Sequence, residues 1–375
     1  MAVIDQPKNT YSDTTPHVRV ITDLISLIDP SDAPLVNALG GLDGASGKFR
    51  FTGGKGKVVE WLEDSLIPLS DVMDEGATIT STVTTIKVTD GSLYQPGHVI
   101  MIDTEYLWVS SISTNTITVT RAAGGSTAAT HNSIAAVTMV GMARLEGAES
   151  DTIALTDVSV GSNFTQIFHQ EIKISRTQQQ LSQYGISDEM AYQGDKVVPS
   201  LMRLIERHLF YNKAASAGSA TTPRVMGGLQ AFMTSNLVQG TSLTQAMIES
   251  AVRLAYEDGG TGPWIAPVAP VNMSKIKNFY DATTVLRVDR TETTVGMNIT
   301  QIETPFGTVN LVLDRWAPTT IIPLIDAKHA GMMTYYPFTQ EPLAKTGDYE
   351  RSEVVGEFSF CLRQAPAHAL LTAVS

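Results

Sequence analysis

Hydrophobic residues repeat every three or four positions in several segments, which predicts helices with one apolar face. Short helices are predicted at residues 18–28 and 34–39, each followed by a helix-breaking pair of residues. The longest helix is predicted at 188–214. A further helix is predicted after Ser242, which we expect to be its N-cap because Gln245 follows three residues later, as in a capping box.

The helix predicted at 188–214 is long enough to serve as a structural spine, at about 40 Å for ~1.5 Å per residue. Pro199 within it indicates a kink or a later start. The apolar face comprises Val197, Leu201, Leu204, Ile205 and Leu209, with His208 beside them. A histidine at the edge of an apolar face is more often a satisfied core residue than a metal ligand.

Alternating hydrophobic and polar residues predict strands in the rest of the chain. Residues 76–142 are rich in Thr and Val and nearly free of charge, and turn residues separate their short strand candidates. These candidates are 85–88, 98–102, 106–112, 116–120 and 135–140. We expect this segment to be a small β-barrel or sandwich inserted into a larger domain, and the overall class to be α+β.

Three further strand regions lie outside that segment. Residues 58–62 are rich in β-branched and aromatic side chains, a hairpin is predicted around the TPFG turn at 304–307, and residues 352–374 read as one long strand or two consecutive ones. Cys361, the single cysteine, falls within this last alternation, so we interpret it as a packing residue rather than a nucleophile.

The stretch TGGKGK at 52–57 suggests a phosphate-binding loop at first sight. A P-loop has the pattern G-x-x-x-x-G-K-[ST] between a strand and a helix. Here Val58 follows Lys57, the first glycine position is Phe51, and the residues that follow predict a strand. We therefore interpret the stretch as a basic bend between two strands.

Composition narrows the classes of protein further. Charged residues make up 17% of the chain, below the ~25% typical of soluble proteins, which fits an exterior largely used in contacts between subunits. The net charge of −12 argues against a sequence-independent grip on nucleic acid. No signal peptide and no apolar run of membrane-spanning length is present in the sequence.

Candidate chemistry is sparse, and we predict no catalytic residue, no cofactor and no metal site. The seven histidines are scattered, without the spacing of metal ligands. An acidic cluster at 60–75 lacks the pattern of a calcium loop, so we interpret it as a solvated edge that meets a basic patch of a neighbour. Together with the lysines of the bend, the candidates for a subunit interface are Lys55, Lys57, Glu60, Glu63, Asp64, Asp74 and Glu75.

The order of elements, with a polar arm, an extended strand pair carrying an insertion, a spine helix, an α/β lobe and a returning strand, resembles the HK97-like fold of major capsid proteins in tailed bacteriophages. The likeness covers nearly the whole chain. The stretches that carry it are LIDPSDAPLVNALG at 27–40, EWLEDSL at 60–66, the β insertion at 96–131, LEGAESD at 145–151, NFTQIFHQEIKISRTQQQ at 163–180, LMRLIERHLFYNKA at 201–214 and the closing strands at 342–371.

The resemblance implies a division into five parts. These are an N-terminal arm at 1–41, an extended loop at 42–75 and 143–164, the β insertion domain at 76–142, a peripheral domain with the spine helix at 165–220 and 335–375, and an axial domain at 221–334. It further implies that TGGKGK bends the extended loop, with its lysines facing carboxylates of a neighbour.

The implied function is self-assembly, as pentamers and hexamers, into an icosahedral phage head that encloses double-stranded DNA without sequence-specific contact. Implied partners are other copies of the chain and a portal protein, with scaffolding and decoration proteins as further candidates. Because only a short arm precedes the first helix, we expect a separate scaffolding protein or none. The implied location is the virion capsid, assembled in the host cytoplasm and without a membrane.

Three alternatives stay open at this point. An encapsulin-type cellular shell shares the fold but holds enzymes instead of DNA. A tail-tube or decoration protein fits less well, because the spine helix is unusual in such small β proteins. A carboxylate-based hydrolase needs two carboxyl groups ~5–9 Å apart, which one sequence does not reveal.

Overall fold

The computed structural model describes residues 33–42, 56–143, 146–147, 156–181, 186–283 and 301–372. The chain divides into two compact units. The main unit combines Met1–Trp61 with Gly161–Ser375, and the barrel unit runs from Leu62 to Val160. The helix predicted at 18–28 lies outside the described residues.

The predicted spine helix is confirmed as α3 (Glu189–Tyr211). The side chain of Asp188 caps it, accepting hydrogen bonds from the backbone N–H groups of Met190 at 2.9 Å and Ala191 at 3.3 Å. Pro199 lies inside the helix, which continues on both sides, so the alternative of a later start is wrong. Its buried apolar side chains are Val197, Leu201, Ile205, Leu209 and Phe210.

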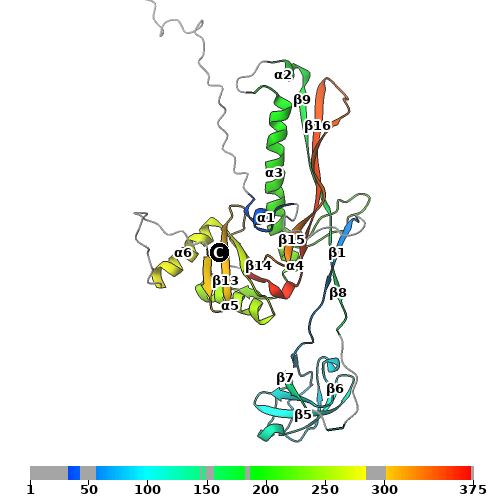
Figure 1. Ribbon diagram of the computed structural model, residues 1–375, viewed down its shortest axis with the longest axis vertical. Helices are drawn as coiled ribbons and strands as arrows, with labels where there is room; N and C mark the ends of the chain where they lie inside the picture. Colours follow the sequence, from blue (N-terminus) through cyan, green and yellow to red (C-terminus); the bar gives the residue numbers. More distant parts are fainter. Residues whose placement is uncertain are drawn as a thin grey trace, which may run out of the picture. The chain divides into compact units, whose positions relative to one another are not determined.

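A three-stranded antiparallel sheet runs beside α3 (Figure 1), in the order β15-β16-β9. Its strands are β15 (Ala330–Leu343), β16 (Tyr349–Leu362) and β9 (Gln166–Ser175). Alternate residues of β9, among them Phe168 and Ile172, are buried in one core with the apolar face of α3. Three short helices complete this part of the main unit: α1 (Pro34–Ala38), α2 (Arg176–Gln180) and α4 (Leu229–Phe232).

The main unit contains a second sheet, which is mixed and has six strands in the order β10-β17-β14-β11-β13-β12. Its strands are β10 (Leu237–Gln239), β11 (Trp264–Val268), β12 (Gln301–Thr304), β13 (Gly307–Leu313), β14 (Ile321–Asp326) and β17 (Ala369–Thr372). Every residue of β14 is buried, as expected for a strand covered on both faces. Helices α5 (Gln245–Glu257) and α6 (Pro270–Thr283) contribute apolar side chains to its core.

The C-terminal stretch forms two strands rather than one. After β16, a short 3-10 turn at Ala365–Ala367 leads into β17, which pairs with β10 and β14. The resemblance had placed residues 335–375 together in the peripheral domain. Strand β17 pairs inside the six-stranded sheet, with strands from residues 237–326.

The N-cap predicted for α5 is wrong. Thr244, not Ser242, accepts the backbone N–H of Met247 with its side chain, at 3.3 Å. Leu243 is buried between the two hydroxyl residues, and this anchors the chain so that the helix begins one residue after Thr244. The side chain of Gln245 bonds Glu249 one turn later instead of closing a capping box.

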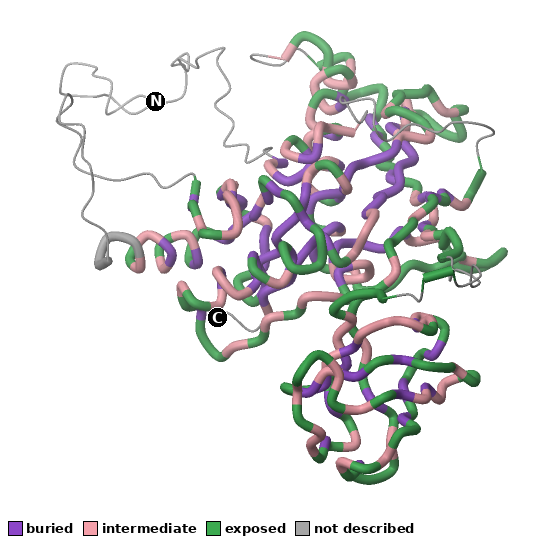
Figure 2. The backbone as a smooth tube through the Cα atoms, turned by 60° about the horizontal axis from the view of Figure 1, so that its bottom comes forward, coloured by how far each residue is buried: buried purple, intermediate pink, exposed green. Residues whose placement is uncertain are grey.

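The barrel unit contains a six-stranded antiparallel sheet in the order β2-β7-β4-β5-β6-β3. Its strands are β2 (Ser70–Val72), β3 (Thr85–Lys87), β4 (His98–Ile102), β5 (Glu105–Ser113), β6 (Thr116–Thr120) and β7 (Ala136–Met142). The predicted strands thus form, and β2 adds an edge strand from within the range expected for the extended loop. Buried residues alternate with more exposed ones along β4 and the first half of β5. Figure 2 colours each described residue of the backbone by its burial.

The two edges of this sheet meet and close it. Met73, just after β2, bridges Val88, just after β3, and the backbone N–H of Thr89 donates to the carbonyl of Val72 at 3.0 Å. Closure removes exposed strand edges and surrounds one apolar core. That core includes Ile86, Val88, Ile100, Ile102, Leu107, Val109, Ile117 and Val137.

Within the described residues, no helix is both long and apolar enough to cross a membrane.

Candidate assembly surfaces

The predicted extended loop begins as a two-stranded ribbon of β1 (Val58–Glu63) and β8 (Ser159–Phe164). Trp61 anchors β1, packing edge-on against Phe232 with ring centroids 5.8 Å apart. A Cβ on Gly161 would lie 2.3 Å from the Trp61 indole nitrogen, so only glycine leaves room for the ring.

Asn163 fixes the other strand of the ribbon. This fully buried side chain donates to the carbonyl oxygens of Phe360 at 2.6 Å and Gly227 at 3.2 Å, and it accepts the N–H of Gly227 at 2.8 Å. Every polar atom of the amide thus has a partner, which fixes this end of β8 to β16 and to the segment before α4.

Beyond Trp61, large apolar side chains are exposed. We call this group the apolar set; its members are Leu62, Leu66, Leu69, Val158 and Val160, with exposed fractions of 71%, 93%, 69%, 53% and 60%. Single exposed apolar residues are ordinary, but five within two short neighbouring segments are typical of a surface that another molecule covers.

The interface candidates near the bend lie in different surroundings. Lys55 is outside the described residues, and Lys57 is exposed. Glu60 is exposed on β1, on the opposite side from Trp61, and Glu63 is half-buried. Asp64 accepts the backbone N–H of Ser65 at 2.9 Å and is exposed. The structure therefore leaves Lys57, Glu60 and Asp64 accessible to a neighbour.

The last two candidates, Asp74 and Glu75, have a local role. Both contact Lys87 of β3: Asp74 forms an ion pair with its ammonium group, and Glu75 accepts its backbone N–H at 2.6 Å. They therefore help to close the barrel. Lys87 is the one lysine or arginine between Lys57 and Arg121, a signal that could have identified it as their partner.

A buried ionic network, which the sequence analysis missed, lies in the barrel unit. Glu105 is fully buried and accepts two hydrogen bonds from Arg121, both at 2.7 Å. His131 bridges Glu105 at 2.9 Å and the exposed Asp103 at 2.7 Å. These four are isolated ionisable residues in a segment otherwise poor in charge, which is the sequence signal that could have pointed to them.

The network is fully satisfied. Burial alone would raise the pKa of Glu105, but hydrogen bonds from Arg121, the backbone N–H of Ala129 and His131 hold that pKa well below its usual range. Arg121 also donates to the carbonyl oxygens of Thr80, Val83 and Ala129 at 2.6–3.0 Å. The group therefore fastens loops of the barrel to β5 and offers no free functional group for chemistry.

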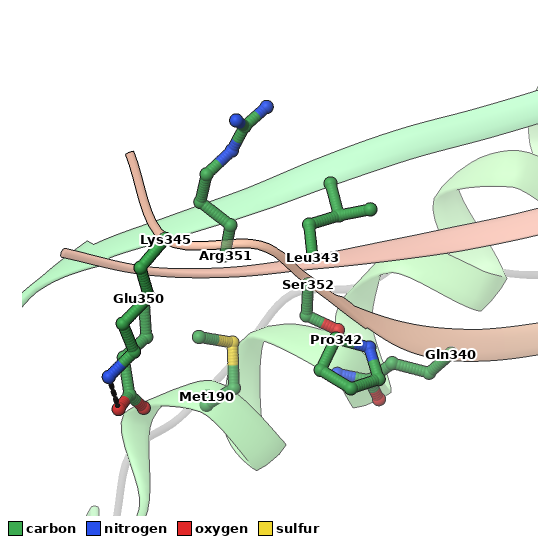
Figure 3. A pocket seen from close by; sticks show the side chains of 8 residues that line it. All are labelled: Met190, Gln340, Pro342, Leu343, Lys345, Glu350, Arg351 and Ser352. Atoms are coloured by element: carbon green, nitrogen blue, oxygen red, sulfur yellow. Dashed lines mark hydrogen bonds and ion pairs between the residues drawn. The ribbon is translucent and has the colours of Figure 1, made fainter. Parts of the chain in front are cut away.

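A hollow of about 420 Å³ lies between the first turn of α3 and the β15–β16 hairpin (Figure 3). Its charged lining residues already have partners within the chain. Lys345 pairs with Glu350 at 2.6 Å, and Arg351 pairs with Glu171 of β9. Among the residues that the structure describes, no group of three or more His, Cys, Asp or Glu is arranged to hold a metal ion.

The sequence and the fold both match known capsid proteins. The SU10 major capsid protein family matches residues 6–375, which is nearly the whole chain. No curated protein sequence matches the chain. The family match favours a phage capsid over the encapsulin and hydrolase alternatives.

A solved capsid structure shows the same fold at low sequence identity, and two further structures align less closely. The capsid of a native GTA particle aligns with a TM-score of 0.53 and 9% identity, covering 99% of this chain and 100% of that chain. The Microbacterium phage Oxtober96 structure aligns with a TM-score of 0.49 and 12% identity, over 94% and 96% of the two chains. An encapsulin complex from Synechococcus elongatus PCC 7942 aligns with a TM-score of 0.43 and 11% identity, over 58% and 78%.

The family match over residues 6–375 and the agreement in fold lead to one conclusion. The chain belongs to the SU10 major capsid protein family: it has the HK97-like fold and is a structural protein of a phage capsid shell, not an enzyme.

Proposed function

We propose that this capsid protein assembles into pentamers and hexamers of an icosahedral head, and that the apolar set mediates contacts between neighbouring copies. The observation that carries the proposal is the exposure of Leu62, Leu66 and their three neighbours, which a single chain leaves in water. At roughly 25 cal/mol per Å² of buried apolar surface, covering them favours association.

The charged residues of the bend supply a second part of the interface. Lys57, with Lys55, is proposed to face carboxylates of the next copy, and Glu60, Glu63 and Asp64 to face cationic side chains. Exposed ion pairs contribute at most about 1 kcal/mol each, so we assign them register and selectivity rather than the main affinity.

The remaining partners follow from the proposed head. The enclosed double-stranded DNA is held without a tight grip, which fits a net charge of −12. A portal protein, and scaffolding or decoration proteins where present, complete the particle, which assembles in the host cytoplasm. The domain ranges implied by the resemblance are kept as part of this proposal. The insertion at residues 76–142 is proposed to lie on the outer surface and to contribute contacts between copies.

The first test is negative-stain electron microscopy of the purified protein together with light scattering. Closed shells, or rings of five and six copies, are expected for the unchanged chain. The double variant Leu62→Ser, Leu66→Ser is expected to fold normally but to remain as free subunits or small oligomers, because it removes the most exposed apolar side chains.

The matched control is Leu204→Ser, which removes a leucine that is 53% exposed on α3 and is not a member of the apolar set. It is expected to assemble as the unchanged chain does. Normal shells from the double variant would refute the role of the apolar set. A chain that stays monomeric, even with a scaffolding protein supplied, would refute the proposed assembly itself.

A further inference from the structure

The barrel unit contains a hollow of about 510 Å³ at the side of β7, which we call the apolar hollow. Its apolar side chains are those of Ile67 and Leu69 from the segment before β2, Leu93 of a 3-10 turn, and Met139, Val140 and Met142 of β7. All of them belong to the barrel unit. Leu69, Val140 and Met142 are 69%, 52% and 59% exposed, which is typical of a surface that another molecule covers.

A β-bulge in β7 shapes one wall of the hollow. The consecutive residues Val99 and Ile100 of β4 pair with Gly141 and Met139, so Val140 is an extra residue without a partner on β4. In a regular strand, successive side chains point to opposite faces. A bulge redirects the side chains beside it, and here Met139 and Val140 both line the hollow although they are adjacent in sequence.

The hollow offers no charge to an occupant. Of the described residues that line it, only His98 is titratable, and its Nδ1 accepts the backbone N–H of Gln95 at 3.2 Å. A ring nitrogen that accepts a hydrogen bond carries no proton, so this imidazole is neutral. Burial lowers the pKa of His98, which favours the same neutral form. The hollow therefore suits an apolar side chain, and its flexible methionines can adapt to the shape of one.

Leu66 is the most exposed large apolar side chain among the described residues, at 93%. Its neighbours Ile67 and Leu69 line the hollow, but Leu66 does not. The carbonyl of Leu69 accepts the N–H of Met139 at 2.8 Å, which holds this segment against β7. The same short segment thus forms a wall of the hollow and presents a leucine outside it. In a single copy of the chain, both the hollow and Leu66 are left uncovered.

A second copy of the chain is the occupant that fits these observations. The chain belongs to a family of capsid shell proteins, so other copies lie next to it in a shell. The hollow also shares Leu69 with the apolar set, so a neighbour that covers the set reaches the edge of the hollow. An uncharged hollow and an exposed leucine are complementary, because burying each removes apolar surface from water.

We propose that the apolar hollow of one copy receives the Leu66 side chain of a neighbouring copy. The inference rests on the proposed function, and it names the surface that receives the most exposed member of the apolar set. The leucine and the hollow are different surfaces of one chain, so each copy donates one and offers the other. Contacts of this head-to-tail kind close into rings when the rotation between copies allows it.

The first test fills the hollow. Gly141 lines it, has no positive φ angle, and would carry a Cβ with no heavy atom within 4 Å, so Gly141→Phe is expected to fold normally. Light scattering measures the lowest protein concentration at which shells form. We expect that concentration to rise at least about tenfold, since burying a leucine side chain favours association by more than the ~1.4 kcal/mol to which tenfold corresponds.

The matched control is Gly76→Phe, the same substitution at another glycine of the barrel unit with open space around its Cβ. Gly76 does not line the hollow, and this variant is expected to assemble as the unchanged chain does. Val140→Asp is a second blocking variant, in case Gly141→Phe does not fold. It places a charge at a 52% exposed position of the hollow and is also expected to raise the concentration required for assembly.

The second test identifies the occupant. Chains carrying Leu66→Cys are mixed with chains carrying Met142→Cys, assembled under mild oxidation and separated on a non-reducing denaturing gel. A disulfide-linked dimer that contains one chain of each kind is expected from the mixture, and no dimer from either variant alone. The native Cys361 is buried and is present in every sample, so it contributes the same background throughout.

Assembly of both blocking variants at the concentration that suffices for Gly76→Phe would overturn the hollow as an interface. Absence of the mixed dimer, with Met142→Cys and also with Val140→Cys in its place, would overturn Leu66 as the occupant. Dimers of Leu66→Cys alone in equal amount would do the same, because two copies of Leu66 would then meet each other. All three results are obtained from shells that have formed, so each leaves the proposed function standing.

Discussion

At the residue scale, a network of buried polar contacts in the barrel unit converges on one carboxylate. Glu105 is the acceptor for two donors of Arg121, for His131 and for two backbone N–H groups. A buried ion pair contributes little compared with a well-packed apolar pair, but breaking it leaves an uncompensated charge. The network is thus costly to disrupt, whatever its net contribution.

The corresponding prediction concerns Glu105→Gln. This nearly isosteric change leaves the guanidinium of Arg121 buried without a counter-ion, and we expect a loss of about 3–5 kcal/mol from the free energy of unfolding of the barrel unit. Scanning calorimetry of the full chain measures it as a lower transition temperature.

The control for this prediction is Asp103→Asn, which changes the other carboxylate bound to His131. The Asp103 side chain is 60% exposed, so its ion pair is expected to be worth no more than about 1 kcal/mol. If both variants destabilise the barrel equally, burial of the charge is not the cause, and the prediction is wrong.

At the scale of elements, the start of α5 allows a direct comparison of two hydroxyl residues. Thr244→Ala removes the side chain that accepts the N–H of Met247 and is expected to destabilise the main unit by about 1 kcal/mol. Ser242→Ala, two residues earlier, is expected to change stability by less than half of that. Urea denaturation of both variants checks the prediction. The prediction fails if Ser242→Ala lowers the free energy of unfolding more than Thr244→Ala does.

Local sequence patterns predicted those helices and strands whose boundaries are set by nearby residues. The Asp188 cap and the stripe through Leu201 identify α3, and turn residues delimit the strands of the barrel. The partners of those elements depend on contacts far apart in sequence. The pairing of β17 with β14 has no local signal, because a short buried strand fits the edge or the centre of either sheet equally well.

The interface candidates were predictable only where local sequence determines their exposure. Exposure of Lys57 and Glu60 follows from the polar bend and the alternation along β1. The engagement of Asp74 by Lys87 depends on closure of the barrel, which brings two edge strands together. The contact of Glu206 with Leu35 spans 171 residues, and only the packed structure shows that a glutamate on the apolar side of a helix is a cap.

At the scale of the whole molecule, the chain separates into two units with their own cores. The barrel unit has a closed sheet and the apolar core around Ile100 and Leu107, whereas the main unit carries the base of the ribbon and both open sheets. A unit with its own core and no free strand edge has what it needs for independent folding. The main unit has two apolar cores of its own, so we expect that it does not require the barrel in order to fold.

The last prediction is that the barrel can be removed without loss of the main fold. The carbonyl of Leu69 accepts the N–H of Met139 at 2.8 Å, so a short Gly-Ser linker in place of residues 70–138 joins positions that are already adjacent. We expect the shortened chain to keep a cooperative calorimetric transition for the main unit, while the barrel transition disappears. Shells of this variant are expected to dissociate at a lower temperature, since the barrel is proposed to contribute contacts between copies. Shells of unchanged thermal stability would remove the barrel from the assembly interface, and a shortened chain that does not fold would show that the two units stabilise each other.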